Sequence, residues 1–256
     1  MPPPYQPNHL TALQHAPYVP LGAVGVAPAT WVPRNGLTLP TGLSLAALPT
    51  LTLNRAQVRT ICTNPALDVR LGYICVMAWG GQGSGPGGAS HAISAWHSIS
   101  ANPARLHTLR AGGLSRCQAY SLFSGSGAVP GLGPSFLTKL LYFFSPTPDF
   151  YIMDQWTSKS VNLLNCFQVV RMAGNAPSTL NKCGNYQAFC EEIDHIAAIL
   201  GCSGQIAEER LFSRGGKSPA PWRAHVLANW PPAPPFPRYS QTALHRRYSH
   251  IPAVCF

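Results

Sequence analysis

The segment from Tyr186 to Leu200 restricts the fold most strongly, because its apolar residues recur at the spacing of an α-helix. They stand at positions i, i+3, i+4, i+7, i+10, i+11 and i+14, namely Tyr186, Phe189, Cys190, Ile193, Ile196, Ala197 and Leu200. Gly201 follows, as expected where a helix ends. The segment therefore predicts a long helix with one buried face.

Other parts of the middle of the chain carry helical signals as well. In "NPALDVRLGYICVMAW" (64–79), Asn64 is a candidate N-cap and Pro65 a candidate first helical residue. "QIAEERLF" (205–212) predicts another short helix. Alternating strand patterns are few and no internal repeat is visible. We expect a mostly α core over residues 52–228.

The two ends differ from this core in composition. Residues 1–51 and 229–256 are rich in proline and contain no acidic residue. They predict weakly structured arms that either pack on the core or extend from it. Beyond Glu209 the chain has only basic charges, which predict either a phosphate-contacting element or a solubilising extension: Arg210, Arg214, Lys217, Arg223, Arg238, Arg246 and Arg247.

Composition narrows the class of partner. The chain is 46% hydrophobic, enough for a sizeable core, and its net charge is +10 from 18 basic and 8 acidic residues. Such an imbalance favours a polyanion such as nucleic acid, although a basic surface without a specific partner is the alternative. We see no signal peptide and no membrane-spanning stretch. The eight cysteines show no disulfide framework, which favours a reduced cytoplasmic protein.

Three further motifs do not support a cofactor or metal. "GSGPGG" (83–88) has dinucleotide-loop spacing, but it follows a predicted helix, contains Pro86 and lacks a later acidic residue, so we expect a flexible interhelical loop. The cysteines and histidines lack ligand-like grouping and are expected in the core or in loops: Cys183, Cys190, Cys202, His91, His97 and His107. We therefore predict neither a metal nor a cofactor.

"VPGLGPS" (129–135) predicts a tight turn that leads into a helix. Gly131 and Gly133 bracket Leu132, and glycine tolerates the positive φ that a tight turn needs. Pro134 suits the first helical position. Apolar residues at helical spacing follow, at Leu137, Leu140, Leu141 and Phe144. The exposed N–H groups where this helix begins are suited to a DNA phosphate, and Leu132 can fill the joint with a preceding helix.

This stretch resembles the helix-hairpin-helix of the DNA glycosylase superfamily that includes 8-oxoguanine glycosylase, endonuclease III and adenine glycosylase. In that family an essential aspartate opens the next helix, and "FYIMDQW" places Asp154 nineteen residues after Ser135. The block from about 71 to 216 is most similar to the prokaryotic 8-oxoguanine-glycosylase-fold group. The resemblance implies a helix-hairpin-helix over about 114–144 and an enzyme acting on DNA.

One position departs from the bifunctional members of the family. Where they carry a nucleophilic lysine, this chain has Ser135, as adenine glycosylases do. Lys139 lies one turn further along, on the same predicted face as Ser135 and Tyr142. Helical side chains lean toward the N-terminus, so the Lys139 amine can reach the space beside Ser135. It is a candidate nucleophile or phosphate contact, and a solvated surface lysine is the alternative.

Asp154 is the candidate catalytic carboxylate. Glycosidic cleavage needs an anion near C1′ to stabilise an oxocarbenium-like transition state or to orient water. Aspartate is also a favoured N-cap, and a helix "QWTSKSVNLL" follows directly, so the two roles are compatible. The later acids are expected on charged helix faces: Glu191, Glu192, Asp194, Glu208 and Glu209.

A base-excising enzyme must also hold a flipped base in an aromatic pocket. Trp156, Tyr142, Trp79 and Trp96 are candidates, each with a plain core position as the alternative. We predict a monomeric, cytoplasmic and nucleoid-associated DNA glycosylase. Its substrate is duplex DNA with an oxidised purine or a phage-type modified base, in repair or antiviral defence, and it has no membrane partner. The alternatives are a non-catalytic helix-hairpin-helix DNA-binding protein and a small scaffold for RNA or protein.

Overall fold

The computed structural model describes residues 5–230, and helices account for most of that part of the chain. The helices are α1 (Pro7–His15), α2 (Pro28–Arg34), α3 (Arg55–Thr63), α4 (Val69–Gly80), α5 (Gly88–Ala101), α6 (Ala104–Ala111), α7 (Arg116–Ser121), α8 (Pro134–Phe144), α9 (Gln155–Leu164), α10 (Cys183–Leu200), α11 (Gly204–Phe212) and α12 (Pro221–Asn229). Short 3₁₀ turns occupy Leu45–Ala47 and Gly125–Gly127. The mostly α fold class is thereby confirmed.

Strands are short in the described residues. β1 (Met172–Ala173) and β2 (Ala176–Pro177) form a two-stranded antiparallel hairpin, in which Ala173 pairs with Ala176. Among the described residues, no helix combines the length and apolar character needed to cross a membrane.

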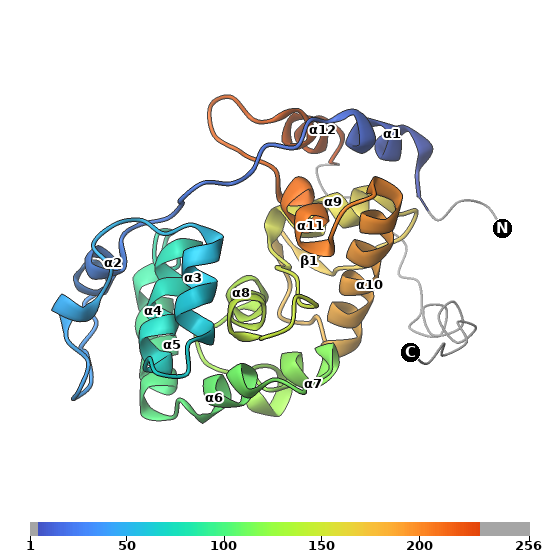
Figure 1. Cartoon of the computed structure of the whole chain (residues 1–256). Coiled ribbons are helices and arrows are strands. Elements are labelled where there is room, and N and C mark those ends of the chain that lie inside the picture. The colour runs from blue at the N-terminus through green and yellow to red at the C-terminus, as the bar shows by residue number, and fades with distance from the viewer. Residues whose placement is uncertain (1–4, 231–256) are drawn as a thin grey trace.

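Two groups of helices meet at the centre of the molecule. Helices α2–α6 form one side, α1 and α9–α12 form the other, and α8 lies between them, while α7 packs against both α8 and α10 (Figure 1). α8 packs against α3, α4, α6 and α7, whereas α9 packs against α10, α11 and α12. The connection from α8 to α9 carries Phe150–Met153, four buried residues, and leads directly to Asp154. The candidate site thus lies where the two groups join.

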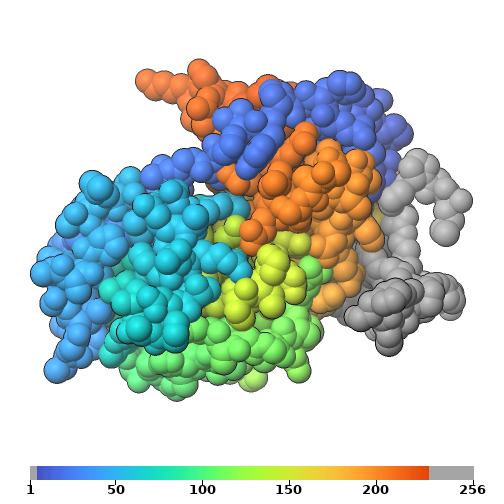
Figure 2. Space-filling view, viewed as in Figure 1, coloured from blue at the N-terminus to red at the C-terminus, as the bar shows by residue number. Residues whose placement is uncertain are grey.

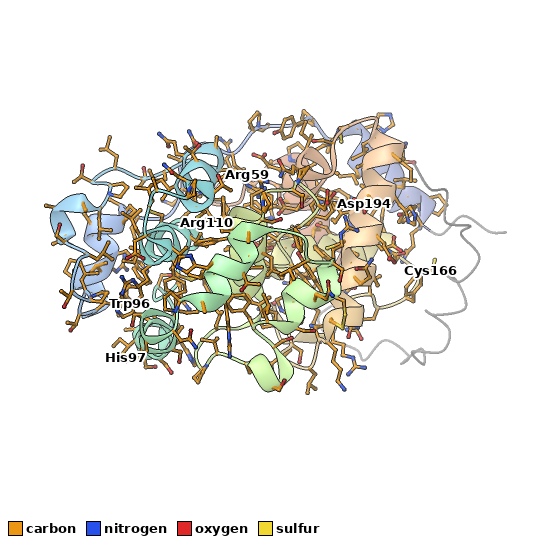
Figure 3. The ribbon with its side chains drawn as sticks, turned by 60° about the horizontal axis from the view of Figure 1, so that its bottom comes forward. Arg59, Trp96, His97, Arg110, Cys166 and Asp194 are labelled. Carbon is orange, nitrogen blue, oxygen red and sulfur yellow. A yellow bond between two sulfur atoms is a disulfide. The ribbon has the colours of Figure 1, made fainter. Side chains whose placement is uncertain are left out.

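Helix α8 is buried on all sides, not only along the predicted apolar stripe. Leu137, Leu140 and Leu141 are buried as expected, but Tyr142 and Phe143 are also less than 5% exposed. Arg59 of α3 donates to the carbonyl oxygens of Tyr142 (3.0 Å) and of residues just beyond the helix, so it satisfies the C-terminal end of α8. In Figure 3, Arg59 and Arg110 are labelled on the helices flanking α8.

The N-terminal segment differs from the weakly structured arm expected over residues 1–51. Residues 5–51 contain α1 and α2, and they bury Tyr5, Leu13, Trp31 and Val32 against the core. Prolines do not oppose this packing, because Pro7 and Pro28 each occupy the first position of a helix. In Figure 2 this segment runs along the surface between the two helical groups. The proposed boundary at residue 52 stays a prediction.

The C-terminal segment is described only in part. α12 ends at Asn229, close to the predicted limit of the core at residue 228. The proposed tail from 229 onward, with Arg238, Arg246 and Arg247, lies almost entirely outside the described residues. Its role in phosphate contact stays a prediction.

The expected start of the helix at Asn64 is wrong. Helix α4 begins at Val69 with Asp68 as its N-cap, whose carboxylate accepts from the Arg70 N–H at 2.8 Å. Asn64 instead ends α3, and residues between 64 and 68 form a turn. Asn64 and Asp68 are both suitable N-cap residues, and the Asp68 carboxylate is the one that caps helix α4.

A disulfide joins Cys117 of α7 to Cys183 of α10, contrary to the expectation of no disulfide. The two cysteines are 66 residues apart in sequence, but α7 and α10 pack together and bring their Cα atoms to 4.6 Å. This proximity has no local sequence signal. The free thiols among the described residues include Cys190, buried on α10 as predicted, and Cys166, which is exposed and labelled in Figure 3.

Candidate active site and nucleic-acid interface

The glycine turn connects α7 to α8 through a closely packed hairpin, residues 129–133. The Leu132 N–H donates to the Val129 carbonyl at 3.0 Å, which closes the turn. Gly131 has φ +78°, and a Cβ there would lie 2.1 Å from the His91 carbonyl oxygen. Glycine is therefore required at 131 by both conformation and space. Leu132 is buried, consistent with its predicted place in the joint.

Gly133 is in a different position. It is the N-cap of α8 with an extended backbone, and a Cβ there would meet nothing within 4 Å. Pro134 opens the helix as predicted. Pro134 has no N–H and the Phe136 N–H donates to the Gly133 carbonyl at 3.0 Å, so the Ser135 N–H is the candidate donor to a phosphate at the start of α8. Ser135, also near this end, is half-buried.

The hairpin borders a hollow of about 590 Å³. Its other walls are the glycine-rich loop after α4 and the segment beginning with β2. Gln82 ties the two loops together, since its Nε2 donates to the Gly131 carbonyl at 3.2 Å. The stretch 83–88, predicted as an interhelical loop, is that loop and leads into α5. Its place beside the hairpin was not foreseen.

Asp154 caps helix α9. Its Oδ1 accepts from the N–H groups of Trp156 (2.8 Å) and Thr157 (3.1 Å), and Thr157 Oγ1 in turn accepts from the Asp154 N–H at 2.9 Å. The side chain is 8% exposed. The predicted N-cap is thereby confirmed. These bonds use one carboxylate oxygen and fix the orientation of the other.

Thr138 connects this cap to α8. Its hydroxyl accepts from the Met153 N–H at 3.0 Å, one residue before Asp154, and donates to the Pro134 carbonyl at 2.9 Å. Thr138 is fully buried. A single hydroxyl therefore sets the Asp154 segment at a fixed position relative to the helix that carries Lys139. Nothing in the sequence near Thr138 indicates this contact.

Lys139 is not a solvated surface lysine, because it is only 7% exposed. Its Nζ donates to the Ser135 carbonyl at 3.2 Å and lies 5.0 Å from the centre of the Phe136 ring. The amine thus leans toward Ser135, as predicted. Burial lowers the pKa of Lys139, while the negative charges of Asp154 and Glu208 oppose that shift.

Helix α4 makes room for this lysine. A Cβ on Gly80 would lie 2.8 Å from Lys139 Cδ and 3.1 Å from Cε. The absence of a side chain at Gly80 lets the aliphatic part of Lys139 pack against the helix backbone. The amine is consequently directed along α8 and not outward between the helices.

A buried ion pair accompanies the two candidate residues. Arg55 of α3 pairs with both carboxylate oxygens of Glu208 of α11, and Glu208 is fully buried. The prediction that Glu208 lies on a charged outer face is therefore wrong, and the same holds for Glu192, which is 2% exposed. Lys139 interacts electrostatically with Asp154, Glu208 and Arg55. Glu208 in turn interacts with Arg55 and Asp154. We call these four residues the charged cluster.

The predicted base-pocket aromatics lie around this cluster. The Arg55 guanidinium is 5.5 Å from the centre of the Trp79 ring and 5.2 Å from that of Tyr142. Trp79 and Tyr142 are buried, whereas Trp156 is half-buried. Trp96 lies apart, in the core, with its Nε1 donating to the Thr38 carbonyl at 2.9 Å. Three of the four candidates are therefore near Asp154 or the cluster, and Trp96 is not.

The described residues contain no group of histidine, cysteine or acidic side chains placed to hold a metal. His97 lies on α5 (Figure 3). Asp194 of α10 is engaged in a separate contact, where it pairs with Arg116 at 2.7 Å.

Comparison with known proteins gives a family for this arrangement. Residues 18–212 match the family described as "Putative 8-oxoguanine DNA glycosylase OGG-like protein". No curated protein and no solved structure matches the chain. The matched range contains the hairpin, Lys139, Asp154 and the Arg55–Glu208 pair, and it excludes α1 and α12. The chain therefore belongs to this family of 8-oxoguanine DNA glycosylase-like proteins.

Proposed function

We propose that this protein is a DNA glycosylase that excises a modified base from duplex DNA. The observation that carries the proposal is a buried lysine on the helix that follows the glycine hairpin, together with a buried aspartate that caps the next helix. Asp154 and Lys139 interact electrostatically, and each is less than 10% exposed. The family description supports an oxidised purine such as 8-oxoguanine as the substrate class.

In this proposal the hairpin binds the DNA backbone. The backbone N–H at the start of α8 donates a hydrogen bond to a phosphate oxygen, and the phosphate occupies the open space beside Gly133. Gly131, Leu132 and Pro134 hold the turn in shape. Such contacts position the duplex without selecting its sequence. The base is then extruded toward Asp154, with Trp156, Tyr142 and Trp79 as the neighbouring aromatics.

Asp154 stabilises the positive charge that develops at C1′ as the bond to the base breaks and the base leaves with the electron pair. Water then adds to C1′, its proton passes to the departed base, and an intact abasic site remains. Lys139 contributes a positive charge that contacts the leaving base or a phosphate, and Ser135 occupies the position of the family nucleophile. We favour this hydrolytic course because the Lys139 amine hydrogen-bonds the Ser135 carbonyl, one turn from that position.

A lyase course is the alternative for Lys139. Burial lowers the pKa of this amine, and only a neutral amine can attack C1′ and form a Schiff base. Borohydride trapping on a substrate duplex separates the two courses. A covalent protein–DNA adduct that is lost in Lys139→Ala would establish the lyase course, and its absence supports hydrolysis.

The decisive test of the function is a screen of duplexes that carry oxidised or phage-modified bases, with mass spectrometry of released bases. We expect release of an oxidised purine by the wild type and none by Asp154→Asn. Hairpin-dependent duplex binding without base release would instead favour a non-catalytic DNA-binding protein. Release of phage-modified bases alone would favour a role in antiviral defence over repair. We further propose that the protein acts as a monomer on chromosomal DNA in the cytoplasm.

A further inference from the structure

We infer that Arg223, on a helix outside the family match, is a positioning residue that holds Trp156 and, through the Trp156 amide, sets the orientation of Asp154. This inference rests on the proposed function, because it gives Arg223 a part in the same site. α12 follows the matched range 18–212, so Arg223 lies outside the part of the chain that the family match covers.

The first observation is the packing of Arg223 on the cap of α9. Its guanidinium carbon lies 3.7 Å from the centre of the Trp156 ring, close enough for stacking. The backbone N–H of Trp156 donates to Asp154 Oδ1. Arg223 therefore fixes the residue whose amide orients the candidate catalytic carboxylate.

The second observation is that the guanidinium is itself held firmly. Arg223 is 5% exposed, and it donates to the carbonyl oxygens of Phe212 and Ser213 at the end of α11, the latter at 2.6 Å. A Cβ on Gly215 would lie 2.7 Å from its Nη1, so the glycine leaves room for the guanidinium. A charged group fixed in this way by carbonyl oxygens cannot leave the site easily.

The third observation is the docking of α12 that carries Arg223. Trp222 Nε1 donates to Ser160 Oγ of α9 at 3.0 Å, and His225 Nε2 lies 3.0 Å from Nδ1 of His9 of α1, within hydrogen-bond distance. Figure 1 shows α1 and α12 side by side above α9 and α11. The two helices outside the family match thus fasten Arg223 over the start of α9.

Charge supports the same assignment. Groups from three helices interact electrostatically with Asp154: Lys139 of α8, Glu208 of α11 and Arg223 of α12. Burial lowers the pKa of Arg223 to about 10, against the opposing attraction of Asp154. Lys159 of α9 adds a further positive charge near Arg223. At neutral pH Arg223 remains charged, so it attracts the Asp154 carboxylate as well as stacking on Trp156.

The test uses the full-length protein and a readout that is independent of catalysis. Hydrogen exchange of the Trp156 and Thr157 amides, which donate to Asp154, is followed by NMR at one fixed pH. We expect these two amides to exchange about tenfold faster in Arg223→Met, because Trp156 loses the group that is stacked on its ring. Arg223→Lys keeps a cation near the ring but loses the planar stack, so a smaller increase is expected.

Arg110→Met is the matched control. Arg110 also donates to two helix-end or turn carbonyls, those of Cys62 and Leu67 at 2.7 Å each, and lies 5.8 Å from the Phe144 ring centre. It is not stacked on Trp156, so its loss should leave the exchange of the two amides unchanged. If Arg223→Met does not fold, Arg223→Gln removes the same guanidinium and keeps a donor for the carbonyls.

Base release provides the second readout. We expect kcat in Arg223→Met to fall about tenfold while KM stays unchanged, because a buried residue does not touch the DNA. Wild-type exchange of the two amides in Arg223→Met would overturn the inference even if base release is observed. Conversely, absence of base release by the wild type would defeat the proposed function, while the NMR comparison would still decide the role of Arg223.

Discussion

The hairpin and the charged cluster adjoin the same helix, α8, yet they differ in what they leave accessible. The hairpin borders an open hollow, and Gly133 faces free space. In the charged cluster, Lys139, Asp154 and Glu208 are 7%, 8% and 0% exposed. The first can meet a phosphate without rearrangement, whereas the second can act only on a group inserted between the helices. The difference implies that DNA binding and chemistry can be separated by mutation.

The largest effect is expected for the ion pair that supports the charged cluster. Glu208→Gln leaves the Arg55 charge buried and unpaired, which typically costs about 3–5 kcal/mol of stability. Asp68→Asn is the control, because Asp68 and Arg70 are partly exposed and asparagine can still cap α4. Urea unfolding should show a large loss for the first variant and under about 1 kcal/mol for the second. Equal losses would contradict the view that burial distinguishes the cluster.

Next in size is the effect of Asp154→Asn on the rate of base release. Removing a preorganised electrostatic stabiliser typically lowers the rate by about 10²–10³-fold. Asparagine retains the shape and capping ability of aspartate, so the fold and the DNA affinity should be preserved. Asp149→Asn, in the exposed loop before the site, is the control. Near-wild-type excision by Asp154→Asn would exclude Asp154 as the catalytic carboxylate.

The hairpin offers a matched pair of glycines. Gly131→Ala introduces a Cβ at φ +78° against the His91 carbonyl, so both stability and duplex affinity should fall, the affinity by about tenfold. Gly133→Val meets no steric obstacle within the fold, and should weaken binding by covering the backbone N–H at the start of α8 while leaving the melting temperature nearly unchanged. Fluorescence anisotropy should show the same loss of affinity for all duplexes, whatever base they carry. A changed base preference at unaltered affinity would argue against a backbone-binding hairpin.

The parts of this site that could be predicted from sequence are those built by neighbouring residues. The start of α8 at Pro134, the turn at Gly131 and the Asp154 cap each depend on residues within a few positions of one another. Local conformational preference is sufficient to specify such features. The resemblance to a glycosylase family then connected them into a site, and the family match agrees with it.

The parts that could not be predicted join remote segments. Arg55 and Glu208 are separated by 153 residues, and each looks like an ordinary surface charge on its own helix. Cys117 and Cys183 are also remote in sequence, as are Arg223 and Trp156, and the neighbours of these residues in the sequence do not indicate either contact. A helical pattern identifies which face is apolar, but it cannot show which charges the packing will bury. The glycine-rich loop was predicted as a loop, but its place beside the hairpin depends on packing between remote segments and could not be predicted.

The smallest expected effect tests whether the Lys139 amine resembles the buried cluster or the open hairpin. Burial lowers the pKa of Lys139, so between that lowered value and the ordinary value of about 10.4 the unfolded chain binds a proton that the folded chain lacks. The free energy of unfolding should therefore rise with pH across this window, by at most about 1.4 kcal/mol per pH unit from this group. In Lys139→Met that contribution disappears, so the curve of stability against pH should be flatter than for the wild type. Lys217→Met, at an exposed lysine, should leave the slope unchanged. Chemical denaturation from pH 7 to pH 10 measures both, and parallel curves for wild type and Lys139→Met would mean that the amine is as well solvated as a surface lysine.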